Sequence, residues 1–386
     1  MSDVRITALN SITAIDGWLK ALAGNLTGST VTGFRQTRVQ FEDVLARQVR
    51  GGSPAGVNGL QSINPIQYSE GGTAIKATRT DFSQGALAAS QRPTDLAIRG
   101  NGFFVLSRVK NPTSVEDLVF TRNGSFTLEY EEDPTILDAA ALGQLGPATV
   151  AGRLNLVSAE GYYVMGLSGT YEPPTATGQP GVSTPPQDKQ VLSGLGGNIS
   201  GALDQFKAFS FPIIKDSNGR LNLNADLVGR LQFNQNGLLL NAGTQDVPQS
   251  AALDPLTRKE RDVPFSIVTS IDPVTGLTKL DLADIGNVNK YVALAVFANP
   301  EGLDRQAGTS FTWGPATGNF AVGVAGFDGQ PIGATNEIAA GNLEAANSSV
   351  NTTLPELTIA QKSFTAQVKI VSVGNTLIDD VNQLIR

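Results

Sequence analysis

The sequence predicts a mainly β protein with α-helical ends. Apolar residues near both ends of the 386-residue chain follow helical spacing, whereas the middle consists of short strand-like runs broken by Gly and Asn. The 42 Gly and 20 Pro residues imply many turns, as short strands require. A chain of this length has room for two or three domains and a substantial buried core.

The first predicted element is a helix within residues 1–34. Its apolar residues alternate spacings of three and four, which places them on one face in a heptad pattern: Ile12, Ile15, Leu19, Leu22 and Leu26. Gly28 and Gly33 mark its end.

The last predicted element is a longer helix within residues 350–386, with a cap at Asn351–Thr353 and Pro355 in its first turn. One heptad seam consists of Leu357, Gln361, Phe364, Val368, Val371, Asn375, Ile378, Asn382 and Ile385. A second stripe runs beside it and consists of Ile370, Val373, Leu377, Val381 and Leu384.

One partner helix cannot cover both apolar faces of the last helix. An internal four-helix bundle is one solution, and burial shared between subunits is the other. We favour the second, because the chain contains only two strong helical patterns. The predicted polymer interface therefore consists of apolar residues of both terminal helices: Ile12, Ile15, Leu19, Leu22, Leu26, Leu357, Phe364, Val368, Ile370, Val371, Val373, Leu377, Ile378, Leu384 and Ile385.

The middle of the chain is predicted as two β blocks. Residues 35–59 are interpreted as a linker, residues 60–167 and 290–349 as an inner β domain, and residues 168–289 as a further β domain that begins with a Pro-, Gly- and Thr-rich stretch. A Gly-Asn-Gly turn at residues 100–102 precedes a strand pattern rather than a helix, so a hairpin is predicted there and a nucleotide-binding loop is not.

Composition limits the function classes. The chain has no Cys and no His, which excludes Ser-His-Asp and Cys-His enzymes, disulfides and thiolate metal sites. Carboxylate-based hydrolysis and a Ca²⁺ site stay open, although no catalytic residue, metal site or cofactor is predicted. The net charge of −7 argues against nucleic-acid binding. Neither an 18-residue apolar run nor a cleavable signal peptide is recognisable, so we expect no membrane insertion, and either a cytoplasmic protein or export without a cleaved signal.

Several short motifs occur in a fixed order along the chain. They include GNL at 24–26, TGFR at 32–35, DFSQG at 81–85, DLAIRGNGFF at 95–104, FTRNGSF at 120–126, NPEGL at 299–303, GNLEAAN at 341–347 and IAQKSF at 359–364. Within them, the residues that we single out are Asn25, Gly33, Phe34, Asp95, Leu96, Gly100, Gly102, Phe103, Phe104, Asn299, Pro300, Gly302, Gly341, Asn342 and Glu344.

In their order and spacing, these motifs resemble those of the bacterial flagellar rod and hook axial proteins. The sequence departs from the usual Asn-rich signature, since Gly24, Gly28 and Val31 stand at places where the family usually has Asn or Thr. The resemblance does not extend over about residues 168–289, where hook proteins carry an extra outer β domain.

The resemblance implies a discontinuous, layered fold in which the terminal helices pair as a coiled coil and the β domains lie outside them. It also implies a homopolymer, most like the flagellar hook, that contacts rod, hook-cap and junction proteins and is exported to the cell surface by the flagellar route. A distal rod protein and a hook-like filament of another cell type are alternatives. A secreted carbohydrate-binding module or enzyme, or a monomeric adhesin, would be a different class.

Overall fold

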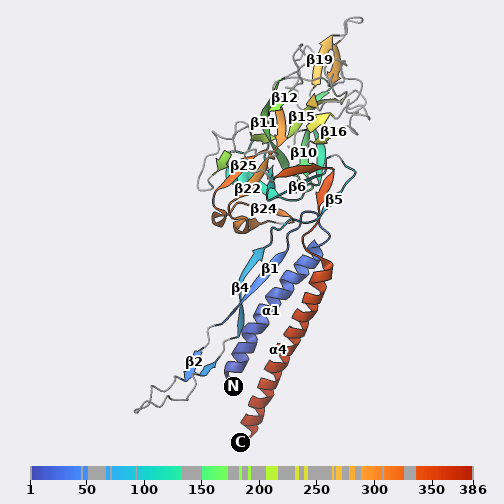
Figure 1. Ribbon diagram of the computed structural model, residues 1–386. Coiled ribbons are helices and arrows are strands. Elements are labelled where there is room, and N and C mark those ends of the chain that lie inside the picture. Colours follow the sequence, from blue (N-terminus) through green and yellow to red (C-terminus); the bar gives the residue numbers. More distant parts are fainter. Residues whose placement is uncertain are drawn as a thin grey trace. The chain divides into compact units, whose positions relative to one another are not determined.

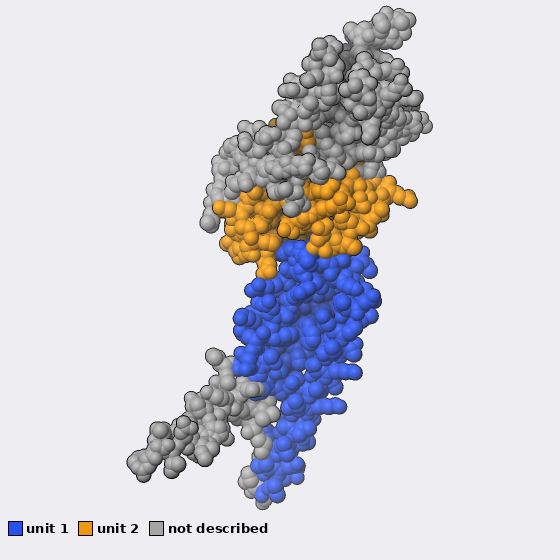
Figure 2. Space-filling view, in the orientation of Figure 1, with its two compact units in different colours: residues 1–31, 35–83, 346–386 blue, residues 32–34, 84–345 orange. Residues whose placement is uncertain are grey.

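The computed structural model describes residues 2–44, 47–50, 67–69, 72–92, 94–132, 150–172, 182–184, 190–192, 206–215, 231–233, 239–241, 263–264, 267–271, 278–282, 288–306, 308–325 and 336–384 (Figure 1). The chain divides into two compact units (Figure 2). Unit 1 contains residues 1–31, 35–83 and 346–386, and unit 2 contains residues 32–34 and 84–345.

Unit 1 is built on the two terminal helices, α1 (Ser2–Gly28) and α4 (Val350–Leu384), which lie side by side (Figure 1). Strand β1 (Thr37–Asp43) pairs antiparallel with β4 (Thr73–Thr80), and this ribbon packs against α1. Strands β2 (Arg47–Arg50) and β3 (Gln67–Ser69) pair separately. Helical termini with β structure between them confirm the predicted fold class.

The sequence predicted the C-terminal end of α1 correctly but not the N-terminal end of α4. α1 ends at Gly28, as expected. α4 begins at Val350, so the predicted cap at Asn351–Thr353 is wrong. The carbonyl of Ser349 instead accepts the N–H of Thr353 at 2.9 Å, and Pro355 lies inside the helix, beyond its first turn.

Unit 2 is dominated by a 14-stranded sheet. Its strands are β7 (Phe103–Ser107), β8 (Leu118–Thr121), β9 (Phe126–Glu132), β10 (Val150–Ser158), β11 (Tyr163–Glu172), β12 (Val182–Thr184), β13 (Gln190–Leu192), β14 (Phe206–Ala208), β15 (Ser210–Lys215), β21 (Val288–Val292), β22 (Leu294–Phe297), β23 (Asp304–Arg305), β24 (Ser310–Thr312) and β25 (Phe320–Gly323). Smaller groups contain β16 (Leu231–Phe233), β17 (Leu239–Asn241), β18 (Val263–Pro264), β19 (Ile267–Ile271) and β20 (Thr278–Leu282).

The two ends of unit 2 are joined by short strand pairs. β6 (Leu96–Arg99) pairs with β26 (Glu337–Ala340), and β5 (Leu87–Ala89) pairs with β27 (Asn342–Glu344). The main core lies beside them and contains Leu96, Ile98, Phe104, Leu106, Phe126, Val164, Val292 and Leu294, each at most 1% exposed. Edge-to-face aromatic pairs extend it, including Phe120 with Phe297 at 4.8 Å between ring centroids.

The hairpin predicted at the Gly-Asn-Gly turn is wrong. A strand does follow the turn, but β6 pairs with β26, while β7 pairs with β8, β11 and β22. Both edges of β7 are occupied by these strands, so β6 has no free edge to pair with. The turn is held instead by the side-chain oxygen of Asn336, which accepts the N–H groups of Asn101 and Gly102 at 2.9 and 3.1 Å.

The predicted domain boundaries remain predictions. Strand β1 occupies part of the predicted linker 35–59, and much of the range 168–289 lies outside the described residues. Gly169 pairs with Asn289 across β11 and β21, so the chain enters and leaves that range at adjacent positions. However, β14 and β15, which also fall in that range, pair with β11 and β10.

Candidate assembly surface

The contact between the terminal helices is a narrow heptad stripe on α4. Apart from Ser363, the residues in the described part of this helix that are not exposed are Thr353, Leu357, Ala360, Phe364, Gln367, Val371, Gly374 and Ile378. Their spacings alternate between four and three, as in a coiled coil, and α1 is the helix that α4 contacts. The small residues Ala360 and Gly374 lie in this stripe and leave room for close approach of the helices.

The stripe shares four of the nine residues of the first predicted seam. Leu357, Phe364, Val371 and Ile378 belong to both. Val368 lies one position outside the stripe and is 43% exposed, and Gln361 and Asn375 are exposed as well. The side chain of Asn382 and all of Ile385 lie outside the described residues.

The second predicted stripe of α4 faces solvent along its whole length. Ile370, Val373, Leu377, Val381 and Leu384 are all exposed, from 38% for Val381 to 86% for Leu384. Ile359 is also exposed on the same flank, eleven residues before Ile370. α4 therefore presents a second apolar face that α1 does not cover.

α1 has one face against α4 and the ribbon and another that is open. Its most buried residues are Ala8, Ser11, Ala14, Leu22 and Asn25. Of the predicted interface residues on this helix, Leu22 is buried, and Ile12, Ile15, Leu19 and Leu26 are half-buried. Ile6 and Leu9 are 56% and 61% exposed, and heptad spacing does not mark them because they precede the regular seam.

Motif residues in unit 1 join helices to the ribbon and its flanking loop. Asn25 is 5% exposed, its side-chain amide donates to the carbonyl of Thr37 at 2.8 Å, and its oxygen accepts the N–H of Thr37 at 2.7 Å. The side chain thereby makes the two hydrogen bonds that a neighbouring strand would make at the start of β1. Asn347 uses its amide in a similar way, accepting from the N–H of Gln36 at 2.7 Å and donating to the carbonyl of Asp81 at 2.7 Å.

The carboxylate of Asp81 has several partners in unit 1. Its carboxylate accepts the N–H of Ser83 and the side-chain amide of Gln36, both at 2.9 Å, and pairs with Arg38 at 2.8 Å. Burial favours a higher pKa for Asp81, but the hydrogen bonds from Ser83 and Gln36 and the charge of Arg38 outweigh it and lower the pKa below its ordinary value.

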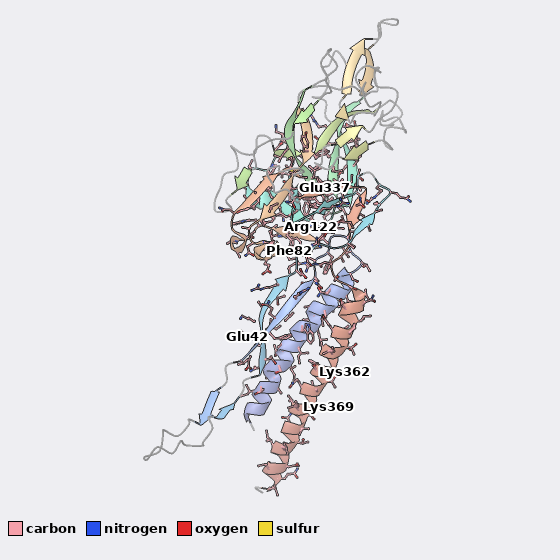
Figure 3. All side chains as sticks on the ribbon, viewed as in Figure 1. Glu42, Phe82, Arg122, Glu337, Lys362 and Lys369 are labelled. Atoms are coloured by element: carbon pink, nitrogen blue, oxygen red, sulfur yellow. The ribbon has the colours of Figure 1, made fainter. Side chains whose placement is uncertain are left out.

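In unit 2, the motif residue Glu344 makes a buried ion pair and a hydrogen bond to the backbone. Its carboxylate lies 3.4 Å from a guanidinium nitrogen of Arg122 and accepts the N–H of Gly85 at 2.7 Å. Both side chains of the pair are at most 1% exposed. Arg122, which is labelled in Figure 3, also donates to the carbonyl of Gly100 at 2.8 Å and lies over the ring of Phe103.

The other motif residues of unit 2 have internal structural roles as well. Gly33 has φ +69°, and a Cβ there would lie 2.5 Å from the backbone nitrogen of Asn123, so only glycine fits. Asp95 is 1% exposed and pairs with Arg92 at 2.7 Å. The rest lie in the core, in the turns or beside them: Phe34, Leu96, Gly100, Gly102, Phe103, Phe104, Asn299, Pro300, Gly302, Gly341 and Asn342.

A groove of about 630 Å³ lies in unit 1 between the end of α1, strand β1 and the start of α4. Trp18, Leu22 and Phe41 form its apolar part, with the rings of Trp18 and Phe41 edge to face at 5.6 Å. Arg38 and Glu356 contribute charged groups to its lining.

Comparison with known proteins agrees with the motifs. No protein-family model matches the chain. It is 34% identical over 129 residues to the flagellar basal-body rod protein FlgG of Borreliella burgdorferi, and 31% identical over 114 residues to the flagellar hook protein FlgE of the same organism. It is also 23% identical over 415 aligned positions to the flagellar hook protein FlgE of Brucella suis, an alignment that covers 97% of this chain and 96% of that protein.

The chain belongs to the flagellar rod and hook protein family. The two alignments with the Borreliella burgdorferi proteins cover 33% and 29% of this chain, and 46% and 24% of those proteins. The chain thus spans less than half the length of these two relatives, whereas the Brucella suis alignment is nearly end to end.

For a member of the rod and hook family, the described residues show a consistent division of roles. Motif residues make hydrogen bonds, ion pairs and packing contacts inside each unit, whereas most of the large exposed apolar residues lie on the terminal helices. No group of three or more Asp or Glu residues in the described ranges is placed to hold a metal ion. Neither helix of the described part is long and apolar enough to span a membrane.

Proposed function

We propose that this chain is a structural subunit that polymerises with copies of itself into a helical tubular filament, and that this filament is the flagellar hook. The observation that carries the proposal is the exposed second stripe of α4, from Ile370 to Leu384. An uncovered apolar face on a long helix has to be buried against something. Further copies of the same chain are the partner that family membership favours.

The energetics of the stripe support assembly as well. Fully burying one Val, Leu or Ile side chain is worth about 1.5–3 kcal/mol relative to leaving it exposed. Each stripe residue is already partly covered, so roughly half of that gain remains available per residue. Five such residues on every copy supply a substantial part of the free energy that association requires.

The extent of the alignments favours the hook over the other axial structures. The near end-to-end alignment is with a hook protein, whereas the rod protein matches one third of the chain. The distal rod and a hook-like filament of another cell type are the alternatives within the same family. Contacts with rod, hook-cap and junction proteins, export by the flagellar route and location in a surface appendage are parts of the same proposal.

Electron microscopy tests the proposal directly. Purified protein incubated at increasing concentration should form tubular filaments with one repeating subunit. Antibody raised against the protein should then label the short curved segment at the base of the flagellar filament on intact cells. Monodisperse particles at all concentrations would contradict the polymer, and labelling confined to the basal body or to a separate appendage would favour the alternatives.

A further inference from the structure

The groove in unit 1 and the exposed stripe of α4 are complementary surfaces that lie toward opposite ends of the same helix pair. The groove is lined by Glu356, near the start of α4, whereas the stripe ends at Leu384. These two residues are 28 positions apart, which corresponds to about 42 Å along a helix. The C-terminal part of α4 therefore cannot fold back into the groove of its own chain.

The end of the stripe combines apolar side chains with a carboxylate, and the groove has aromatic rings and the guanidinium of Arg38. Between Lys369 and Arg386 the chain has no cation and two carboxylates, Asp379 and Asp380. With the repeat of seven that relates Ile359, Ala366 and Val373, the next residue on the same flank is Asp380. The end of the stripe is thus two leucines, Leu377 and Leu384, with one carboxylate between them.

The groove lining combines the rings of Trp18 and Phe41 with one cation, Arg38, and one carboxylate, Glu356. Phe41 is 39% exposed, so its ring is available for apolar contact. The side chain of Arg38 is 67% exposed although it already pairs with Asp81. A guanidinium has five N–H donors, so Arg38 can donate hydrogen bonds to a second carboxylate as well.

We infer that the C-terminal end of α4 from one copy docks in the groove of the next copy, with Leu377 and Leu384 on Trp18 and Phe41 and with Asp380 beside Arg38. This inference rests on the proposed polymer and names one contact within it. A contact between different patches at the two ends of a subunit is heterologous, so it repeats without closing and produces an open filament. The same geometry explains why a single chain leaves both surfaces uncovered.

A charge exchange tests the predicted pair. Arg38→Glu or Asp380→Lys alone should raise the critical concentration for assembly by at least about tenfold, because each removes one member of a docked charge pair. Arg38→Glu combined with Asp380→Lys should recover most of that loss. The matched control is Arg38→Glu with Asp379→Lys, which changes the adjacent carboxylate off the stripe and should recover little.

Both double variants carry the same change at residue 38, so any destabilisation of unit 1 is common to them. Equal recovery by the two combinations would overturn the inference, because it would show a general effect of net charge. Absence of recovery by both would overturn the pairing of Arg38 with Asp380.

Cysteine cross-linking tests the docking with the native charges in place. The chain has no cysteine, so introduced thiols are unique. Copies that carry Val39→Cys, in the groove lining, are mixed with copies that carry Leu384→Cys, assembled and oxidised. A dimer that contains one copy of each type should form only in the assembled state.

The control is Thr365→Cys, an exposed position outside the stripe, in place of Val39→Cys. Equal cross-linking at both positions, or none at Val39, would overturn the inference while leaving the polymer proposal intact. If the unmodified chain forms no filaments at all, the proposed function itself fails and the docking contact fails with it.

Discussion

At the scale of single residues, Glu344 shows how the family motifs hold unit 2 together. It lies in β27, and Arg122 lies 222 positions earlier, so their ion pair ties the two ends of the unit. Glu344→Gln keeps an acceptor for the N–H of Gly85 but removes the negative charge that faces Arg122. Because breaking a buried pair from one side costs about 3–5 kcal/mol, we expect a loss of this size in the free energy of unfolding of unit 2.

Denaturant unfolding followed by tryptophan fluorescence measures this loss. The chain has two tryptophans, Trp18 in unit 1 and Trp313 in unit 2, so a Trp18→Phe background reports on unit 2 alone. The control is Glu337→Gln, whose partner Arg99 is 57% exposed, and which should cost less than about 1 kcal/mol. Equal losses from the two substitutions would show that the buried pair has no special weight.

Asp81 gives unit 1 a predictable response to acid. Its pKa is lower in the folded chain than in the unfolded chain, so its contribution to stability is complete above the ordinary pKa of 3.8 and is lost as the pH falls below that value. Asp81→Asn should therefore lower the unfolding midpoint of unit 1 near pH 6, and the difference from the unmodified chain should shrink toward pH 3. Trp18 fluorescence in a Trp313→Phe background follows the midpoints, and a constant difference across this pH range would contradict the assignment.

At the scale of elements, the sequence predicted which segments are helices but not which residues face each other. Large apolar side chains suggested Val368 as a seam position, whereas the observed stripe passes through Ala360, Gln367 and Gly374. Spacing alone cannot distinguish two stripes one residue apart, because small residues can form the contact and larger ones can flank it. The hairpin prediction at the Gly-Asn-Gly turn was wrong for a related reason. The strand before the turn, β6, pairs with β26, whose residues lie more than 230 positions away in the sequence.

Deletion of residues 352–386 tests the role of α4 as an element. The truncated chain keeps every residue of unit 2 and loses the stripe and one wall of the groove. We expect no filaments at concentrations where the full chain assembles, because the uncovered apolar face is gone. In a Trp18→Phe background, the free energy of unfolding reported by Trp313 should stay within about 0.5 kcal/mol of the full chain, as expected for changes away from the reporting core. Filaments of the truncated protein would refute the assignment.

At the scale of the whole molecule, family membership was predictable from motifs, whereas the groove was not. The motif residues are recognisable because their internal hydrogen bonds and close contacts demand particular residue types, as at Gly33 and Asn25. The groove is formed by α1, β1 and the start of α4, which are brought together only by folding. No local pattern in the sequence marks such a surface.

A substitution at Val368 tests whether other copies of the chain cover the exposed flank of α4. The side chain lies beside the α1 contact and is 43% exposed in the single chain, so a charge there can remain hydrated. In the polymer we expect neighbouring copies to cover it. Val368→Asp should then cost several kcal/mol per copy, as for an unpaired buried charge, and should raise the critical concentration by orders of magnitude.

The melting temperature of the unassembled chain should hardly change in Val368→Asp. The control is Lys362→Asp, which changes the charge of an exposed side chain six positions earlier on α4 (Figure 3) and should have a milder effect on assembly. Sedimentation gives the soluble fraction after assembly, and thermal unfolding gives the stability of the unassembled chain. If Val368→Asp strongly lowers the melting temperature and still polymerises normally, the flank of α4 is an internal core surface, and other copies do not complete it.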